Sequence, residues 1–302
     1  PPPVRVGGIL LALALAAMCA DIAATLALGG RLLRGVVVLL VLGAPDVGVA
    51  QDGVARIAAS EIVLAHVVTG DARVDDIAAA GLAGLSQTLN SRTSVEPAAP
   101  IGVDLEVDEL AFYPLLYWPI VPSQVMPTPQ AFDRLNAYLR SGGMILFDTR
   151  DGDISGFGGV GVQARKLQEL AAPLDIPPLE PIPNDHILTR TFYLLQDFPG
   201  RFTSRDIWVE ASQPGAGPSS DAPFQNLKDG VTPVVIGGND WASAWAVGAN
   251  GAPLVAIGRG FAGDRQRELA RRFGVNLVMH VLTGNYKSDQ VHIPALLDRL
   301  GQ

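Results

Sequence analysis

Residues 61–68 read EIVLAHVV, a nearly continuous apolar run. A run of this kind predicts a β-strand that is covered on both faces, as in a parallel sheet. Soon after it, Asp75 or Asp76 can cap a helix. The apolar or small residues of that helix recur every four positions: Ile77, Gly81, Leu85 and Leu89. The segment therefore predicts a buried strand followed by a helix that packs on the sheet.

The same alternation continues for another 80 residues or so. Residues 108–120 form a second apolar strand candidate, closed by Pro119 and Pro122, and residues 144–147 form a third. Between them, Thr128-Pro129 is typical of a helix start, with an N-cap followed by proline at the first helical position. This helix would end at Gly142 and Gly143 and bury one stripe of side chains: Phe132, Leu135, Tyr138 and Leu139. Strand, helix, strand, helix and strand with short joints predict right-handed crossovers and a parallel sheet with helices on both faces.

The second half of the chain is less regular. Residues 163–171 predict a short helix, residues 174–183 contain too many prolines for a helix or a strand, and residues 212–223 are typical of a surface loop. Two strand candidates, 233–237 and 254–257, are expected to form an antiparallel pair at the sheet edge.

A long amphipathic helix is expected near the end of the chain. Asp264 would cap it and Gly284 would follow its last residue. Its apolar stripe is formed by Leu269, Phe273, Leu277 and Val281.

The N-terminal part differs in composition and is expected to be a membrane anchor. Residues 4–30 are apolar or small and contain two charged residues; about 20 such residues in a helix cross a hydrocarbon core roughly 30 Å thick. Residues 35–50 form a second, shorter apolar run, which leaves a helical hairpin, an interfacial segment and a cleavable hydrophobic stretch as alternatives. The predicted domains are the anchor, 1–55, and an α/β domain, 56–302.

The number of spans decides the side of the membrane. If both runs cross, the positive-inside rule places Arg31 and Arg34 in the cytoplasm and the α/β domain in the periplasm, on the inner membrane of a Gram-negative cell. With one span, the domain would lie on the side of these arginines. The start, Pro1-Pro2-Pro3, has no initiator Met, as expected of the C-terminal piece of a longer protein.

Partners are expected in the bilayer. Small residues recur every four positions on one face of the first span, which favours close approach of a second membrane helix: Gly8, Ala12, Ala16, Ala20 and Ala24. Accidental spacing in an Ala-rich helix is the alternative. Asp21 would mark a polar partner or lie near the headgroups of a tilted helix.

Charge and cysteine content exclude several functions. The formal net charge is −8 and the pI is near 5.0; nucleic acid is therefore not expected as a partner, because such binding needs clustered Lys and Arg. The single cysteine, Cys19, lies in the anchor. The α/β domain consequently has no disulfide and no thiol.

Six segments of the chain resemble one bacterial family: TGDARVDDIAAAGLAGLSQTL from Thr69, DELAFYPLLYWPI from Asp108, LNAYLRSGGMILFDTRD from Leu135, DHILTRTFYLLQDFPGR from Asp185, GGNDWASAWA from Gly237 and RRFGVNLVMHVLTGNYKSDQVHIPALLDRLGQ from Arg271. The resemblance is to an uncharacterised domain-of-unknown-function family with a class I glutamine-amidotransferase-like fold. In longer members this domain follows an aerotolerance-regulator-type double-transmembrane region. The resemblance implies a flavodoxin-like, three-layer α/β domain with a parallel sheet, preceded by one or two membrane helices.

Glutaminase chemistry is excluded by the residues themselves. It needs a cysteine on a sharp turn between a strand and a helix, activated by a histidine, and residues 56–302 contain no cysteine. A serine in its place would require Gly-x-Ser-x-Gly. Neither Gly84-Leu85-Ser86 nor Ile154-Ser155-Gly156 completes that pattern.

Ligands of open parallel sheets bind beyond the carboxyl ends of the strands, an edge that we call the crest. The residues expected there, as candidates for a small-ligand site with carboxylates and aromatic walls, are Asp71, Trp118, Asp148, Arg150, Asp151, His186, Asn239, Asp240 and Trp241. The alternative is that Asp and Asn at strand ends cap helices and close turns.

No metal and no cofactor are expected. Residues 151–156 copy the first half of a calcium loop, but its twelfth position is Val162 rather than the required Glu. The histidines, His66, His186, His280 and His292, lack the spacing of zinc ligands. Of these, His186 is the one to test.

Two functions fit the sequence. The first is a non-catalytic ligand-binding or scaffolding module of a larger membrane protein. The second is metal-assisted or acid–base hydrolysis by the carboxylates at the crest together with His186. Convergence of Asp148, Asp240 and His186 would favour hydrolysis, and their dispersal would favour the module.

Overall fold

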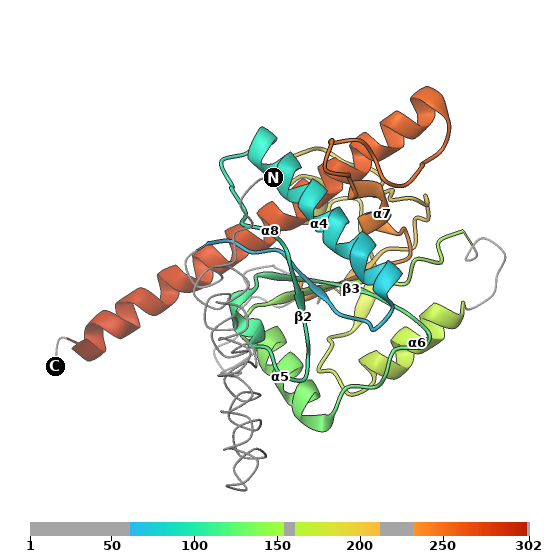
Figure 1. Ribbon diagram of the computed structural model, residues 1–302. Helices are drawn as coiled ribbons and strands as arrows, with labels where there is room; N and C mark the ends of the chain where they lie inside the picture. The colour runs from blue at the N-terminus through green and yellow to red at the C-terminus, as the bar shows by residue number, and fades with distance from the viewer. Residues whose placement is uncertain (1–60, 154–160, 212–231, 301–302) are drawn as a thin grey trace, which may run out of the picture. The chain divides into compact units, whose positions relative to one another are not determined.

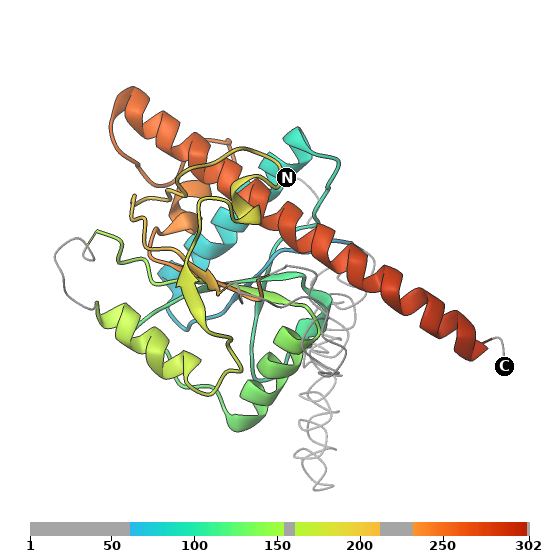
Figure 2. The same cartoon turned by 180° about the vertical axis from the view of Figure 1, so that it is seen from behind.

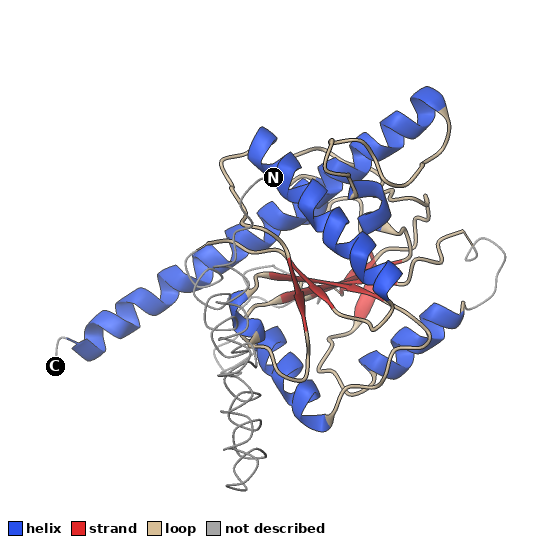
Figure 3. Ribbon diagram, in the orientation of Figure 1, coloured by secondary structure: helices blue, strands red, loops and turns tan. Residues whose placement is uncertain are grey.

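The computed structural model describes residues 61–153, 161–211 and 232–300. These residues form a mixed α/β domain around a seven-stranded sheet in the order β2-β1-β3-β4-β7-β6-β5 (Figures 1 and 3). The strands are β1 (Ala65–Val67), β2 (Ile101–Val103), β3 (Leu115–Pro119), β4 (Met144–Asp148), β5 (Leu179–Pro181), β6 (Trp208–Glu210) and β7 (Val234–Gly237). The first five strands of that order run parallel, whereas β6 and β5 are antiparallel to their neighbours. The expected mixed α/β class and largely parallel sheet are confirmed.

Helices cover both faces of this sheet. They are α4 (Ala72–Arg92), α5 (Pro129–Arg140), α6 (Val162–Ala171), α7 (Trp241–Trp245) and α8 (Gly260–Leu300), with short 3-10 turns η1 (Leu110–Phe112) and η3 (Ile187–Thr189). Helices α4, α7 and α8 lie on one face and α5 and α6 on the other (Figures 1 and 2).

Two hydrophobic cores follow from the alternation of side chains along the strands. On β3, Leu115 and Tyr117 belong to the core under α4, α7 and α8. Their neighbours Leu116 and Trp118 belong to the core under α5 and α6. Neighbouring side chains of β3 therefore pack into opposite cores, one on each face of the sheet.

Helix α4 approaches α7 closely through two glycines. A Cβ atom on Gly81 would lie 2.6 Å from the carbonyl oxygen of Ala242, and one on Gly84 would lie 2.0 Å from that of Trp245. No side chain fits in either place. This contact fixes α7, and with it the turn at the end of β7, against the sheet.

The central elements agree with the sequence predictions. Residues 63–67 are buried and include β1. Helix α5 begins with Pro129 after the N-cap Thr128, whose side chain accepts a hydrogen bond from the Ala131 N–H. Strand β4 also lies where it was expected.

Three predicted boundaries on the N-terminal side were wrong. Helix α4 is capped by Asp71, not by Asp75 or Asp76, because the Asp71 side chain accepts hydrogen bonds from the backbone of its first turn. The expected strand 108–120 is shorter, since η1 occupies its first part. The edge strand β2 directly follows Pro97 and Pro100, where a break in the chain and no strand was expected.

The expected antiparallel pair was also wrong. Strand β7 lies inside the sheet, parallel to β4, and residues 254–257 form no strand. The antiparallel edge consists of β6 and β5, and β5 falls within the proline-rich stretch 174–183. Pro181 is tolerated there because an edge strand has free backbone positions.

The last helix is longer than expected. Helix α8 begins at Gly260, before Asp264, and continues through Gly284 to Leu300. Its predicted stripe is nevertheless correct, since Phe273, Leu277 and Val281 are buried in the core.

Several predictions fall outside the described residues: the two membrane runs 4–30 and 35–50, the domain boundary at 55, and the loop 212–223. Within the part of the chain that is described, no helix combines the length and apolar character needed to span a bilayer.

Candidate functional site

Asp148, the last residue of β4, is the centre of the crest and is completely buried. Its Oδ2 accepts hydrogen bonds from the Tyr117 hydroxyl at 2.9 Å and the Trp241 N–H at 2.7 Å. Its Oδ1 accepts from the N–H groups of Asp240 at 3.0 Å and Arg150 at 3.1 Å. One carboxylate thus joins β3, β4 and the start of α7.

The environment of Asp148 also changes its acidity. Burial raises its pKa to about 7, and the neighbouring Asp240 carboxylate acts in the same direction. The hydrogen bonds from Trp241, Tyr117 and Asp240 oppose this rise because they stabilise the ionised form. Asp148 is therefore a carboxyl group that exchanges its proton near neutral pH.

Asp240 occupies a strained turn between β7 and α7. Its φ is 52°, in the left-handed region that non-glycine residues rarely adopt. A strained turn from a strand into a helix is also the position of the nucleophile in many hydrolases. Here the side chain is a carboxylate that is only 4% exposed, with Oδ2 at 3.4 Å from the Arg201 guanidinium. Among the described residues, its Oδ1 has no hydrogen-bond partner.

Asn239 and Trp241 hold a neighbouring loop in place. The Asn239 amide donates to the carbonyl oxygens of Phe198 and Ser204, both at 2.9 Å, and accepts from the Ser204 N–H at 2.7 Å. The Trp241 indole donates to the same Phe198 oxygen at 3.0 Å. Both residues are fully buried, so their polar atoms serve the protein's own backbone.

The segment after β4 fills the rest of the crest. Asp151 is buried and accepts a hydrogen bond from the Thr149 hydroxyl. Arg150 has a φ of 56°, and its buried Nε has no hydrogen-bond partner in the described part of the chain. Close packing extends to Gly238, where a Cβ atom would lie 2.9 Å from Asp151 Oδ1.

Six of the nine predicted site residues are brought together in this way: Asp148, Arg150, Asp151, Asn239, Asp240 and Trp241. Asp71 instead caps α4, with hydrogen bonds from the N–H groups of Arg73 and Val74, as the capping alternative predicts.

Trp118 and His186 lie elsewhere. Trp118 is fully buried under α5 and α6, where its indole donates to the Gln124 side chain at 3.1 Å. His186 caps η3, and its ring centre lies 6.3 Å from that of His280 on α8. Asp148 and Asp240 therefore meet as expected, whereas the contacts of His186 are with Leu188 and His280 and do not join it to the two carboxyl groups.

One residue of the site, Arg201, was missed, and of the pair Tyr117-Trp118 expected at the crest, Trp118 was chosen as the candidate although Tyr117 is the one that contacts Asp148. Tyr117 faces Asp148 because adjacent strand residues point to opposite faces, and only one of Tyr117 and Trp118 can reach the Asp148 side. The alternation along β3 could have revealed this. Arg201 pairs with Asp240 although 39 positions of sequence separate them, so no local pattern predicts this pair.

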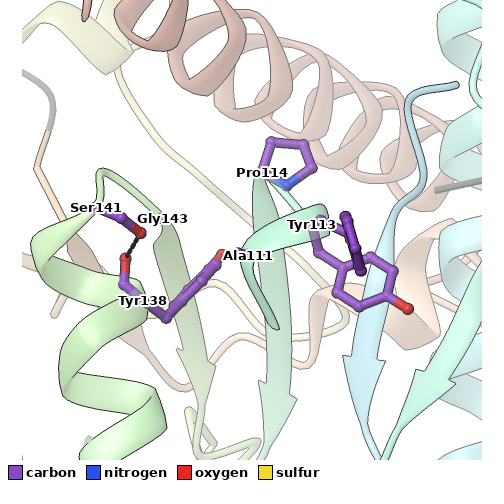
Figure 4. A pocket seen from close by; sticks show the side chains of 7 residues that line it. Ala111, Tyr113, Pro114, Tyr138, Ser141 and Gly143 are labelled. Atoms are coloured by element: carbon purple, nitrogen blue, oxygen red, sulfur yellow. Dashed lines mark hydrogen bonds between the residues drawn. The ribbon is translucent and has the colours of Figure 1, made fainter. Parts of the chain in front are cut away.

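A separate pocket of about 150 Å³ lies at the opposite edge of the sheet, where β3 and β4 begin (Figure 4). Its lining residues are Ala111, Phe112, Tyr113, Pro114, Tyr138, Ser141 and Gly143. The Ser141 hydroxyl donates to the Tyr138 carbonyl oxygen at 2.9 Å. The pocket holds no carboxylate and no imidazole, so it does not share the chemistry of the crest. Within residues 61–153, 161–211 and 232–283, no three His, Cys, Asp or Glu side chains are grouped so as to hold a metal ion.

A family model described as a domain of unknown function, DUF4159, matches residues 63–282 of the chain. No curated protein matches this chain.

The raised pKa of Asp148 predicts a pH-dependent stability. Its stabilising contribution is fully present below the pKa of about 4 in the unfolded chain and is lost as the pH rises through the folded pKa of about 7. Within this window the free energy of unfolding should fall as the pH rises, by about 1 kcal/mol or more in total, relative to the variant Asp148→Asn. Denaturant unfolding at several pH values between 4.5 and 7.5, roughly the span of that window, measures the slope.

Asp76→Asn is the matched control, because Asp76 is an exposed carboxylate on α4. It should leave the pH dependence unchanged. A constant stability difference between the wild-type chain and Asp148→Asn across this pH range would contradict the assignment.

Proposed function

The chain belongs to the DUF4159 family of domains of unknown function. From the geometry of its site and from its sequence, we propose that it is a non-catalytic ligand-binding or scaffolding module of a larger membrane protein. The observation that carries this proposal is the residue at the turn between β7 and α7. Asp240 is held there, buried and paired with Arg201, where a hydrolase would present an exposed nucleophile.

The proposed fold is class I glutamine-amidotransferase-like and flavodoxin-like. The largely parallel sheet with helices on both faces, and the strained strand-to-helix turn, support it. A member of that fold without its cysteine has lost glutaminase activity, and the α/β domain contains no cysteine. The term pseudoenzyme describes this proposal.

The hydrogen bonds of the crest support the same conclusion. The four donors to Asp148 and the three hydrogen bonds of the Asn239 side chain come from the protein itself. Polar groups that satisfy one another in this way hold the backbone in place. Asp240 Oδ1 and Arg150 Nε have no hydrogen-bond partner among the described residues, but both atoms are buried and so are not presented to a substrate. Ligands or partners would then bind on other surfaces of the domain.

Membrane attachment is part of the proposal. The apolar runs 4–30 and 35–50 support an anchor in the inner membrane, with the lipid bilayer and a second membrane protein as partners and the α/β domain in the periplasm. The net charge of −8 argues against nucleic acid.

A second candidate function, acid–base hydrolysis at the crest, is favoured by one observation. Burial raises the pKa of Asp148 to about 7, which suits a group that transfers protons near neutral pH. Against it, the side chain is completely buried.

Hydrolysis assays distinguish the two candidates. We expect the chain of residues 1–302 to hydrolyse chromogenic ester, amide and phosphate substrates no faster than buffer alone, with or without added Mg²⁺ or Zn²⁺, because no nucleophile is presented. Asp76→Asn again serves as the control. Turnover by the wild-type chain and the control that is lost in Asp148→Asn or in Asp240→Asn would refute the non-catalytic proposal.

Cysteine labelling tests the membrane arrangement. Replacing Cys19 by Ala and introducing Asp76→Cys leaves one thiol, at an exposed position of α4. In intact Gram-negative cells, a membrane-impermeant maleimide should label this thiol and the chain should sediment with membranes, because the α/β domain is expected in the periplasm. Labelling only after lysis would place the domain in the cytoplasm, and a chain that stays in the supernatant would contradict the anchor.

A further inference from the structure

Three apolar side chains are exposed on two loops that follow β2 and β3. Val107, in the loop after β2, is 65% exposed, and Val125 and Met126, between β3 and α5, are 83% and 40% exposed. The carboxylate of Glu106 joins the two loops, because it accepts hydrogen bonds from the N–H of Thr128 at 2.9 Å and from its hydroxyl at 2.6 Å. The exposed apolar side chains therefore belong to one surface.

The loop that carries Val107 is held in one conformation by its own hydrogen bonds. The Asp108 carboxylate accepts from the Asp104 N–H at 2.7 Å, and the Asp104 carboxylate accepts from the Glu106 N–H at 2.9 Å. From α5, the Arg134 guanidinium donates to the Leu105 carbonyl oxygen at 2.6 Å. A partner would thus meet a preformed surface, which reduces the entropy cost of binding.

This surface is strongly acidic. Four of the six residues 104–109 are carboxylates: Asp104, Glu106, Asp108 and Glu109. None of the four forms an ion pair within the described part of the chain. We call these four carboxylates and the apolar side chains of Val107, Val125 and Met126 the acidic rim. Its chemistry fits a partner that presents a large apolar side chain among positive charges.

The first turns of α8 present that combination on the same chain. Phe261 is 87% exposed, and Arg259 and Arg265 are exposed beside it. Phe261 and Arg265 are four positions apart in the helix and so share one of its faces. Neither arginine forms an ion pair with another described residue. We call Arg259, Phe261 and Arg265 the basic tip. Aromatic residues and arginine are enriched at protein interfaces.

The acidic rim and the basic tip lie on opposite sides of the domain. In Figures 1 and 2 the first turns of α8 are at the top, whereas the start of α5, which follows the rim segment directly, is at the bottom. One copy of the domain therefore cannot join its own tip to its own rim. The two surfaces can meet only between copies.

We propose that copies of this chain bind one another head to tail, with the basic tip of one copy docked on the acidic rim of the next. Phe261 then packs on Val107, Val125 and Met126, and the two arginines of the tip face the carboxylates of the rim. The contact joins two different surfaces, so its repetition produces a ring or a row of copies. This inference goes beyond the proposed function and does not depend on it.

Cross-linking between copies tests the contact. In chains of residues 1–302 with Cys19→Ala, one preparation carries Ser123→Cys beside the rim and another carries Ala262→Cys beside the tip, both at exposed positions. Mixed in detergent with a bis-maleimide, the two preparations should form a cross-linked dimer about tenfold or more faster than either does alone. Ser91→Cys, the same substitution at an exposed position of α4, replaces Ser123→Cys in the control and should not be linked to the tip.

Charge reversal shows whether the complementary charges carry the contact. Arg265→Glu in the tip chain should reduce the cross-linking about tenfold or more, and Glu109→Arg in the rim chain should restore it. Arg73→Glu, at an exposed position of α4, is the matched control in the tip chain and should have no effect. Circular dichroism verifies that each variant is folded.

Three results would overturn the proposal: no preference of the rim thiol for the tip thiol, equal cross-linking through Ser91→Cys, or cross-linking that is unchanged by Arg265→Glu. A different basic partner for the rim would leave the copies unlinked and so would give the first of these results. If Glu109→Arg does not fold, the comparison of Arg265→Glu with Arg73→Glu decides alone.

Discussion

The buried carboxylate of Asp148 is the constraint on which the rest of the crest depends. It accepts hydrogen bonds from the side chain of β3, from the backbone that follows β4 and from the first residues of α7. A completely buried carboxylate is costly unless such donors surround it. Asp148 therefore fixes where β7 ends and α7 begins, and the close contact of α7 with the glycines of α4 transmits that position to the helical layer.

This arrangement explains why the strained turn at Asp240 persists. Its left-handed backbone directs two consecutive N–H groups, those of Asp240 and Trp241, at Asp148. Strain of this kind is maintained only where surrounding contacts determine the conformation. In hydrolases with a strained strand-to-helix turn, the residue at the turn is an exposed nucleophile, whereas the Asp240 side chain is buried beside Arg201. The strained turn thus contributes to packing in this domain.

The centre of the fold could be predicted from the sequence, and its edges could not. Strands β1 and β4 are covered on both faces and appear as apolar runs, and α5 has its own capping residue, proline and stripe. Strands β2, β5 and β6 are as short as β1 but are partly exposed, so they show neither an apolar run nor a period. At the site, strand-end carboxylates were found because parallel strands end at one edge. Trp118 was expected to line the crest, but its side chain packs on the opposite face of the sheet from that of its neighbour Tyr117. The pairs Arg201–Asp240 and His186–His280 join residues that are far apart in the sequence, so no local pattern predicts them.

The most direct test of the account is a double-mutant cycle between Tyr117→Phe and Asp148→Asn, read as free energies of unfolding at about pH 8.5, above the pKa of about 7 at which Asp148 ionises. If the hydrogen bonds to Asp148 hold the crest together, Tyr117→Phe should lower the free energy of unfolding only in the chain that keeps the Asp148 carboxyl group. The account predicts a coupling energy of about 1 kcal/mol or more between the two substitutions. Effects that add to within about 0.3 kcal/mol would contradict it.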